Sequence, residues 1–208
     1  MSSDQLSKID LGVEYNSSVI VELGMGEGEL LKLMVKNGFD INLQANRKTV
    51  RYIGIELDKE AFGVAKSRIK DVYENITLLN GSFEDILPNF RDSSINQILV
   101  VLPDPLFIDK PYRRRWQRFY EIAYSKLENG GLLRLVTEIT DDLFEAVSDE
   151  AYEKWVDWLS QTFKSLGFAI LHRIDGAPPE YFSRCLTQFR GDPQRIRMVT
   201  LDLVKKPK

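Results

Sequence analysis

The chain has 208 residues and a mass of 24.0 kDa, which is the size of one large domain. Hydrophobic residues make up 43% of the chain, enough for a full core, and the formal net charge is −3. That balance excludes a global positive field of the kind that attracts nucleic acid. Residues 1–10 are polar, and no stretch approaches the roughly 20 apolar residues of a membrane span, so we expect neither a targeting segment nor a membrane partner.

A single cysteine, Cys185, and a single histidine, His172, exclude further functions. They permit no intramolecular disulfide and too few ligands for a zinc site of the Cys/His type, so we expect no metal. The scarcity of cysteine fits a reducing, cytoplasmic location. An alternating run around His172 favours a structural histidine over a catalytic base, and Cys185 is interpreted as a small apolar filler.

Short apolar runs and amphipathic helical windows alternate along the chain. The predicted strands are residues 18–23, 52–55, 75–79, 95–102, 132–137, 168–174 and 196–204. The predicted helices are residues 29–37, a segment from Asp58 to Val72, residues 83–90, residues 114–127 and a long segment that ends at Gly167. This order predicts an α/β fold, with a doubly wound, seven-stranded, mostly parallel sheet of the Rossmann-like type.

The C-terminal part departs from the simple alternation. The last two predicted strands have no clear helix between them, so we expect an antiparallel hairpin at the sheet edge and an antiparallel C-terminal strand. Residues 175–193 are rich in glycine and proline and are predicted to form a long irregular loop, which in compact domains is often functional. No repeat or linker divides the chain, so we expect one domain over residues 1–208.

Ligands of open α/β sheets bind outside the carboxyl ends of the strands, and the first strand ends in a glycine-rich loop. Glu22 is followed by Gly24, Gly26 and Gly28, whose missing side chains let a ligand approach the backbone. The spacing differs from the dinucleotide pattern, and the glutamates of the loop would repel a pyrophosphate. The loop therefore favours an uncharged nucleoside ligand.

The next two strand ends suit the same ligand. Glu56 ends the second strand, and its carboxylate can accept both hydroxyl protons of a ribose. Ser82 and Phe83 follow the third strand, where an adenine could be hydrogen-bonded and stacked. A glycine loop, a ribose-binding acid and an adenine contact at consecutive strand ends predict an S-adenosylmethionine site.

The fourth strand runs into Pro103-Asp104-Pro105 and then into a basic cluster. The two prolines fix the backbone around Asp104 and hold its carboxylate at the mouth of the cleft. The cluster lies at the start of a predicted helix whose dipole these cations oppose, and it contains Lys110, Arg113, Arg114, Arg115 and Arg118. We therefore expect these cations to bind a ligand rather than to form an ordinary solvated helix start.

From Pro103 to Arg115 the sequence resembles the tRNA (guanine-N7)-methyltransferase family, which has Pro-Asp-Pro-Trp and a later Lys-Arg-Arg cluster at the same spacing. The likeness extends to the glycine loop, to Gly54-Ile-Glu56, to Leu135-Val-Thr-Glu138 and to Thr187-Gln-Phe-Arg190, and covers roughly residues 18–204. The departures from the family pattern are Leu106 for tryptophan, Ile108 for lysine, Ser82 for an acid and Arg190 for glutamate.

The resemblance implies an S-adenosylmethionine-dependent enzyme of the class I methyltransferase fold that forms 7-methylguanosine in tRNA. It implies cofactor-side roles for Glu22, Glu56, Ser82 and Asp104 and guanosine-side roles for Glu138 and Thr187. The complete prediction is: catalytic Asp104 and Glu138; cofactor-binding Glu22, Gly24, Gly26, Gly28, Glu56, Ser82, Phe83 and Asp104; substrate-binding Lys110, Arg113, Arg114, Arg115, Glu138, Thr187 and Arg190.

Two other interpretations stay open: a methyltransferase of the same fold that acts on a small molecule or protein, and a non-catalytic RNA-binding subunit. No DNA partner is expected, and the sequence does not decide between a monomer and a homodimer.

The charge is unevenly distributed along the chain. Residues 103–118 carry five bases and two acids, residues 184–208 carry seven bases and two acids, and residues 138–153 carry seven acids and no base. A chain with a pI near 5.4 can therefore bind tRNA through one face.

Overall fold

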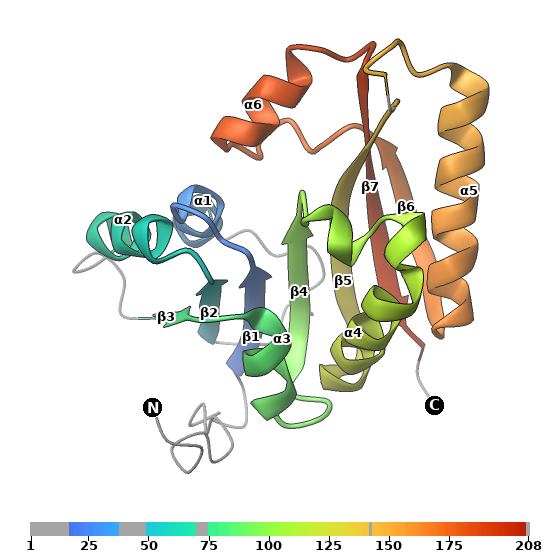
Figure 1. The fold of residues 1–208 in the computed structure, drawn as a ribbon. Coiled ribbons are helices and arrows are strands. Elements are labelled where there is room, and N and C mark those ends of the chain that lie inside the picture. Colours follow the sequence, from blue (N-terminus) through green and yellow to red (C-terminus); the bar gives the residue numbers. More distant parts are fainter. Residues whose placement is uncertain (1–16, 38–48, 70–74, 142, 207–208) are drawn as a thin grey trace.

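A seven-stranded sheet runs through the computed structural model, which describes residues 17–37, 49–69, 75–141 and 143–206 (Figure 1). The strands are β1 (Ser17–Leu23), β2 (Thr49–Glu56), β3 (Ile76–Asn80), β4 (Ile95–Val101), β5 (Leu127–Thr140), β6 (Phe168–Asp175) and β7 (Ile196–Lys205). Their order in the sheet is β3-β2-β1-β4-β5-β7-β6. Strands β1 to β5 pair in parallel, and β7 is antiparallel to both β5 and β6. The predicted fold class is confirmed.

Helices cover both faces of the sheet. The helices are α1 (Glu29–Asn37), α2 (Lys59–Ile69), α3 (Phe83–Ile86), α4 (Arg113–Lys126), α5 (Asp149–Ser165) and α6 (Arg184–Arg190). Helices α1, α2 and α6 pack on one face and α3, α4 and α5 on the other (Figure 1). Because successive strand residues point to opposite faces, Ile20 packs in the cluster with α1, α2 and α6, and Val21 packs in the cluster with α3, α4 and α5. No helix in the described ranges is long and apolar enough to cross a membrane.

The connections reverse direction between β1 and β4. The chain leaves β1 toward β2 and β3, then crosses back to β4 and β5 on the other side. The carboxyl ends of β1 and β4 therefore flank the topological switch point, where α/β sheets bind ligands. The loop after β1 is fixed there by hydrogen bonds from the Gly24 and Met25 amides to the carbonyl of Ile55, at 2.9 and 3.0 Å.

Two elements differ from the prediction in their bounds. Strand β5 begins at Leu127 rather than at Leu132, because Leu127 pairs with Ile95 before a register shift in the β4–β5 ladder. The predicted helix over residues 83–90 ends early in a 3₁₀ turn (Leu87–Asn89), since Pro88 cannot continue an α-helix.

The segment between β6 and β7 was predicted to be irregular, and this prediction is wrong for residues 184–190, which form α6. The Ser183 side chain accepts a hydrogen bond from the Leu186 amide at 3.1 Å, which caps the helix start. Leu186 then anchors α6 to the core because its side chain is fully buried. The antiparallel pairing of β6 and β7 is confirmed, with β6 at the edge.

A buried ion pair joins the β5–β7 ladder to the segment before α6. Arg134 donates two hydrogen bonds to the carboxylate of Asp202, at 2.6 and 2.8 Å, and both residues are buried. Arg134 also donates to the Tyr181 hydroxyl at 3.3 Å. His172, predicted to be structural, lies on β6 with Nδ1 3.3 Å from Asp202 Oδ2 and with an exposed side chain.

Candidate cofactor and substrate site

A cavity of about 550 Å³ opens at the carboxyl ends of β1 and β4. Glu22, Gly24 and Gly26 line it from the first strand end, and Leu102 lines it from the fourth. Its outer wall is formed by the start of α6 and the two residues before it, Phe182, Ser183, Arg184, Cys185 and Leu186. The cavity therefore lies where the strand ends predicted a ligand.

Glu22 is the buried polar residue of this cavity. Its side chain is only 3% exposed, and its Oε2 atom has no hydrogen-bond partner among the described residues. Burial, followed by repulsion from Glu56, raises the pKa of Glu22 to about 8. A buried acceptor without a partner costs free energy unless a ligand pairs with it, so this position fits a ligand with a cationic or hydrogen-bond-donating group.

The three predicted glycines have two different roles. Gly24 and Gly26 have positive φ angles of 71° and 55°, and a Cβ built on either would meet nothing within 4 Å. Both line the cavity, so their backbone is open to a ligand. At Gly28 a Cβ would lie 2.9 Å from Ile69 Cδ1 and 3.1 Å from Ala65 Cβ, so this glycine allows α2 to pack closely. A cofactor contact for Gly28 stays a prediction.

Glu56 stands beside the cavity and holds the glycine loop. Its Oε2 accepts a hydrogen bond from the Gly26 amide at 2.7 Å, and its Oε1 accepts one from the Asp58 amide at 2.8 Å. Each carboxylate oxygen has a second lone pair, which a ribose hydroxyl could use. The predicted ribose contact is thus compatible with this loop-holding role.

The predicted adenine contacts are engaged elsewhere in the fold. Ser82 caps α3, with its Oγ accepting from the Glu84 amide at 3.1 Å. Phe83 packs against Phe107 and Phe119, with ring centroids 4.7 and 5.0 Å apart. Their contacts with a cofactor stay predictions, and the structure assigns both residues to local packing and capping.

Three carboxylates gather at the ends of β4 and β5: Asp104, Asp109 and Glu138. Burial, followed by repulsion from Asp109, raises the pKa of Glu138 to about 7. Burial, followed by repulsion from Asp104, raises the pKa of Asp109 as well. The Oε2 atom of Glu138 is buried and has no hydrogen-bond partner in the described part of the chain. We refer to these three residues as the carboxylate trio.

Leu102, which lies between β4 and Asp104, has a strained backbone conformation. Leu102 has a φ of 49° although it precedes Pro103, and its amide donates to the Val136 carbonyl at 2.8 Å. Such a left-handed conformation costs an ordinary residue roughly 1–2 kcal/mol, and a following proline disfavours it further. Asp104 then accepts from the Leu106 amide at 2.9 Å and caps a 3₁₀ turn (Pro105–Phe107), which leaves its carboxylate exposed.

All five members of the basic cluster are exposed, and two of them also have side-chain partners. Arg115 pairs with Glu84 at 3.1 Å and lies over the Phe107 ring. Lys110 lies over the Trp158 ring, 5.1 Å from its centroid. Arg113 and Arg114 are exposed at the start of α4, so they are the members best placed to contact a large ligand.

The two predicted substrate residues on α6 have local partners. Thr187 is exposed, and its hydroxyl donates to the Ser183 carbonyl at 2.9 Å. Arg190 donates to the carbonyls of Tyr181, at 2.7 Å, and of Pro178. Arg190 therefore holds the segment before α6, and its contact with a substrate stays a prediction.

Some residues of the site were missed or misinterpreted. Cys185 is exposed and lines the cavity, so its interpretation as an apolar filler is wrong; Leu186 supplies the buried contact of α6 instead. Asp109 was not predicted, because only the three-dimensional fold brings it near Glu138. The α6 wall had a usable sequence signal, since Ser183 has the side chain of a helix cap.

A family model described as "Putative methyltransferase" matches residues 16–163. Similar curated proteins are named tRNA (guanine-N(7)-)-methyltransferase. That of Bacillus velezensis is 30% identical over 183 residues, which cover 69% of this chain and 80% of the relative. That of Aliivibrio fischeri is 28% identical over 129 residues, which cover 59% of this chain and 50% of the relative. The chain thus spans about half the length of some of these relatives.

Solved structures share the fold. Phosphoethanolamine N-methyltransferase 2 of Haemonchus contortus, in complex with phosphomonomethylethanolamine and S-adenosylhomocysteine, matches with a TM-score of 0.61 and 13% identity, over 94% of this chain and 50% of that one. M. jannaschii TYW2 in complex with AdoMet matches with a TM-score of 0.54 and 12% identity, over 98% of this chain and 74% of that one. From the family match and the curated relatives, this chain belongs to the tRNA (guanine-N7)-methyltransferase family.

Proposed function

We propose that this protein transfers a methyl group from S-adenosylmethionine to N7 of a guanosine in tRNA. The observation that carries the proposal is the carboxylate trio near the carboxyl ends of β4 and β5, although none of its residues is among those that line the cavity. Leu102, which lines the cavity, and Val136, to which it is hydrogen-bonded, each lie two residues before a predicted catalytic acid, Asp104 and Glu138 respectively. Family membership supports the same reaction.

The cavity residues fit S-adenosylmethionine. The unpaired Oε2 of Glu22 can accept from a cationic group, the open backbone at Gly24 and Gly26 allows close approach, and Glu56 keeps lone pairs for hydroxyl donors. When bound, this cofactor supplies a methyl group on a positively charged sulfur. An acid with a raised pKa beside a cation would lose its proton, so Glu22 can neutralise part of the ligand's charge.

The carboxylate trio suits methylation of a ring nitrogen. Guanine N7 attacks with a free lone pair, so no proton must leave first and no general base is needed. The purine gains positive charge as the bond forms, so a carboxylate nearby stabilises the transition state more than the ground state. Glu138 and Asp104 are proposed for this role, and their acceptor atoms can also bind the N1 and N2 donors that distinguish guanine from adenine.

The exposed arginines suit an RNA substrate. Contacts with phosphates position RNA without reading its sequence, and they can supply the few kcal/mol needed to unstack a base. Arg113 and Arg114 start α4, and Asp109, in the turn just before it, belongs to the trio. We propose tRNA as the partner and the cytoplasm as the location, which the single free thiol supports.

The test is to incubate the protein with labelled S-adenosylmethionine and unmodified tRNA and to search the digested RNA for 7-methylguanosine. We expect label at one guanosine position, which mapping of the tRNA would identify. Label on protein or on small metabolites would instead support a different substrate. Cofactor binding without transfer to any substrate would support a non-catalytic RNA-binding subunit.

A further inference from the structure

A second cavity lies on the other side of α6, and we refer to it as the flank cavity. Its volume is about 280 Å³, and residues of α5, α6, β7 and the end of β6 line it. Among the described residues, the two cavities share no lining residue. Leu186 lines the larger cavity, whereas Phe189 and Arg190 line the flank cavity, so α6 separates them.

The walls of the flank cavity combine apolar side chains with guanidinium groups. Phe189, Ile196 and Met198 supply apolar surface, and Arg190 and Arg197 supply positive charge. Asp175 also lines the cavity, and its Oδ1 is engaged by the Tyr152 hydroxyl and by Arg173. The volume is at the lower limit of ligand pockets, which suits one base or nucleoside better than a longer molecule. Proteins bind unstacked RNA bases with this combination of aromatic faces, apolar surface and arginine planes.

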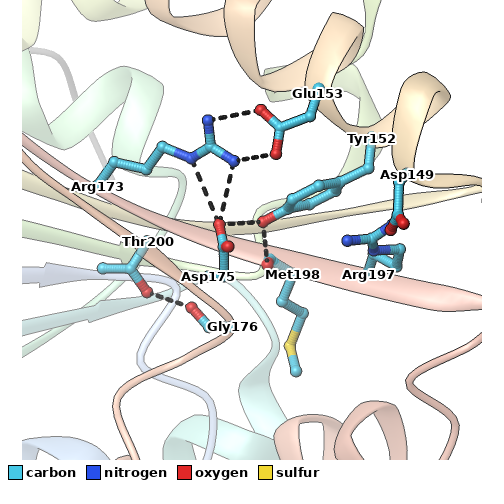
Figure 2. Close-up of polar contacts among 9 residues, drawn as sticks. All are labelled: Asp149, Tyr152, Glu153, Arg173, Asp175, Gly176, Arg197, Met198 and Thr200. Carbon is cyan, nitrogen blue, oxygen red and sulfur yellow. Dashed lines mark hydrogen bonds and ion pairs between the residues drawn. The ribbon is translucent and has the colours of Figure 1, made fainter.

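The Arg197 side chain is held in a position from which it could bind a phosphate. Figure 2 shows Tyr152 between Arg173 and Arg197, with the guanidinium carbon of Arg197 4.0 Å from the centroid of the Tyr152 ring. The Tyr152 hydroxyl is itself fixed, 2.9 Å from both Asp175 Oδ1 and the Met198 carbonyl oxygen (Figure 2). The platform under Arg197 is therefore rigid.

The present ion-pair partner of Arg197 is easily replaced. Arg197 Nη1 lies 2.6 Å from Asp149 Oδ1, but the Asp149 side chain is 96% exposed. Exposed ion pairs contribute little to stability. A phosphate can make two parallel hydrogen bonds to a guanidinium, so it can displace Asp149 without disturbing the Tyr152 platform.

The flank cavity adjoins Glu138 of the carboxylate trio. Met198 pairs with Glu138 in the β5–β7 ladder, where the Cα atoms of opposed residues are about 5 Å apart. Transfer requires the reacting atoms to be within about 3–3.5 Å of each other, and the cofactor is proposed for the larger cavity, so we place the target base at the larger cavity as well. A ligand in the flank cavity is one strand away from that base.

We propose that the flank cavity binds a nucleotide that adjoins the target guanosine in the RNA substrate, with its base against Phe189 and Met198 and its phosphate at Arg197. The proposal rests on the proposed function and adds a second recognition site to it. Binding the neighbour there would help to hold the target nucleotide out of its stack.

The test compares Arg197→Gln with Arg173→Gln in the full chain. Arg173 is the matched control, because its guanidinium also lies over the Tyr152 ring, at 5.7 Å, and is paired with Glu153, but it does not line the cavity. Binding of an unmodified tRNA transcript is measured at several salt concentrations, alongside methyl transfer. Arg197→Gln should weaken binding about tenfold and reduce the salt slope by about 0.7–0.9, the value for one phosphate contact. Arg173→Gln should stay within about twofold of the parent, since it leaves that contact intact.

A second variant tests whether an RNA base occupies the flank cavity, and it changes no charge. Ala177 lines the flank cavity, and Ala177→Leu would fill part of it. We expect weaker tRNA binding with an unchanged salt slope, because the phosphate contact is kept. Binding equal to that of the parent would overturn the placement of a base in the cavity, and this variant keeps the proposal testable if Arg197→Gln does not fold.

The outcomes separate this proposal from the proposed function. Methyl transfer by the parent together with unchanged tRNA binding by Arg197→Gln would overturn the flank-cavity proposal alone, as would equal losses in both arginine variants. Arg197-dependent tRNA binding by a parent that transfers no methyl group would support the flank cavity and overturn the proposed reaction. A parent that neither binds nor methylates tRNA would overturn both.

Discussion

The proposed cofactor and substrate sides of the site each contain a glutamate with a buried Oε2 atom, Glu22 and Glu138, but they are built differently. On the cofactor side, the acid next to Glu22 is Glu56, which two backbone amides hold in place. On the proposed substrate side, the acid that acts on Glu138 is Asp109, which is itself repelled by Asp104; both aspartates lie in turns after β4. Backbone hydrogen bonds therefore hold the acid beside Glu22, whereas burial and repulsion between side chains raise the pKa of Glu138 and of Asp109.

Removing the charge of Asp104 should have the largest effect on the rate of methyl transfer. Asp104→Asn keeps an acceptor for the Leu106 amide, so the turn should survive while the negative charge is lost. We expect methyl transfer to fall roughly a hundredfold, as for other groups that stabilise transition-state charge. The measurement is kcat with tRNA, and the melting temperature serves as the control. Near-normal kcat would remove Asp104 from the reaction.

The pH profile of the reaction should report Glu138. The carboxylate form is the one that stabilises positive charge, and its pKa of about 7 means that the ionised fraction increases as the pH rises. We expect kcat to rise about tenfold from pH 6 to pH 8 in the parent, since the pKa of about 7 lies midway. In Glu138→Gln the profile should be flat and low. A parent profile without this rise would show that the ionisation of Glu138 does not control the reaction rate.

Cofactor binding should have a different pH dependence, set by Glu22. A cationic ligand favours the ionised form of a group whose free pKa is about 8, so binding should release a proton. Affinity for S-adenosylmethionine should therefore increase about tenfold between pH 7 and pH 9 and then level off. Calorimetry of Glu22→Gln should show no such increase.

Glu27→Gln is the matched control for that experiment. Glu27 lines the same cavity from the same loop, but it is exposed and paired with Arg68. Its substitution should leave the pH dependence of cofactor binding intact. A loss of the pH dependence in the control as well would assign it to the general charge of the loop.

The smallest expected effect concerns the exposed arginines of the substrate side. Replacing Arg113 and Arg114 with glutamine should weaken tRNA binding a few-fold and reduce the salt slope by about 1.4–1.8 if each contacts one phosphate. Arg115→Gln should change the slope less, because Arg115 is already paired with Glu84. If Arg115→Gln has the larger effect, the RNA approaches from the α3 side.

The sequence predicted the fold well because strands and helices follow local patterns. Apolar runs located all seven strands, and Asp58 was correctly expected to begin a helix, since it caps α2 through the Ala61 amide. Glycine and proline concealed α6, which is short and depends on one buried leucine for its place. The extension of β5 to Leu127 was not predictable either, because Asn129-Gly130-Gly131 marks a helix end and a register shift equally well.

The site was less predictable because its details depend on contacts between distant segments. Glu22, Gly24 and Gly26 line the cavity and were predicted from the sequence, because they lie at or just after the end of the first strand. It did not show that Gly28 serves helix packing, because the neighbouring atoms come from α2. The involvement of Asp109 depends on how the turn after β4 folds back toward β5, which no local pattern encodes.

The Arg190 contacts with the segment before α6 have a consequence for experiments on this protein. Arg190 binds backbone carbonyl groups, which do not titrate, rather than carboxylates. The outer wall of the larger cavity should therefore keep its position across the range in which Glu22 and Glu138 change charge. Titrations of binding and of catalysis can then be assigned to carboxylates rather than to movement of the wall.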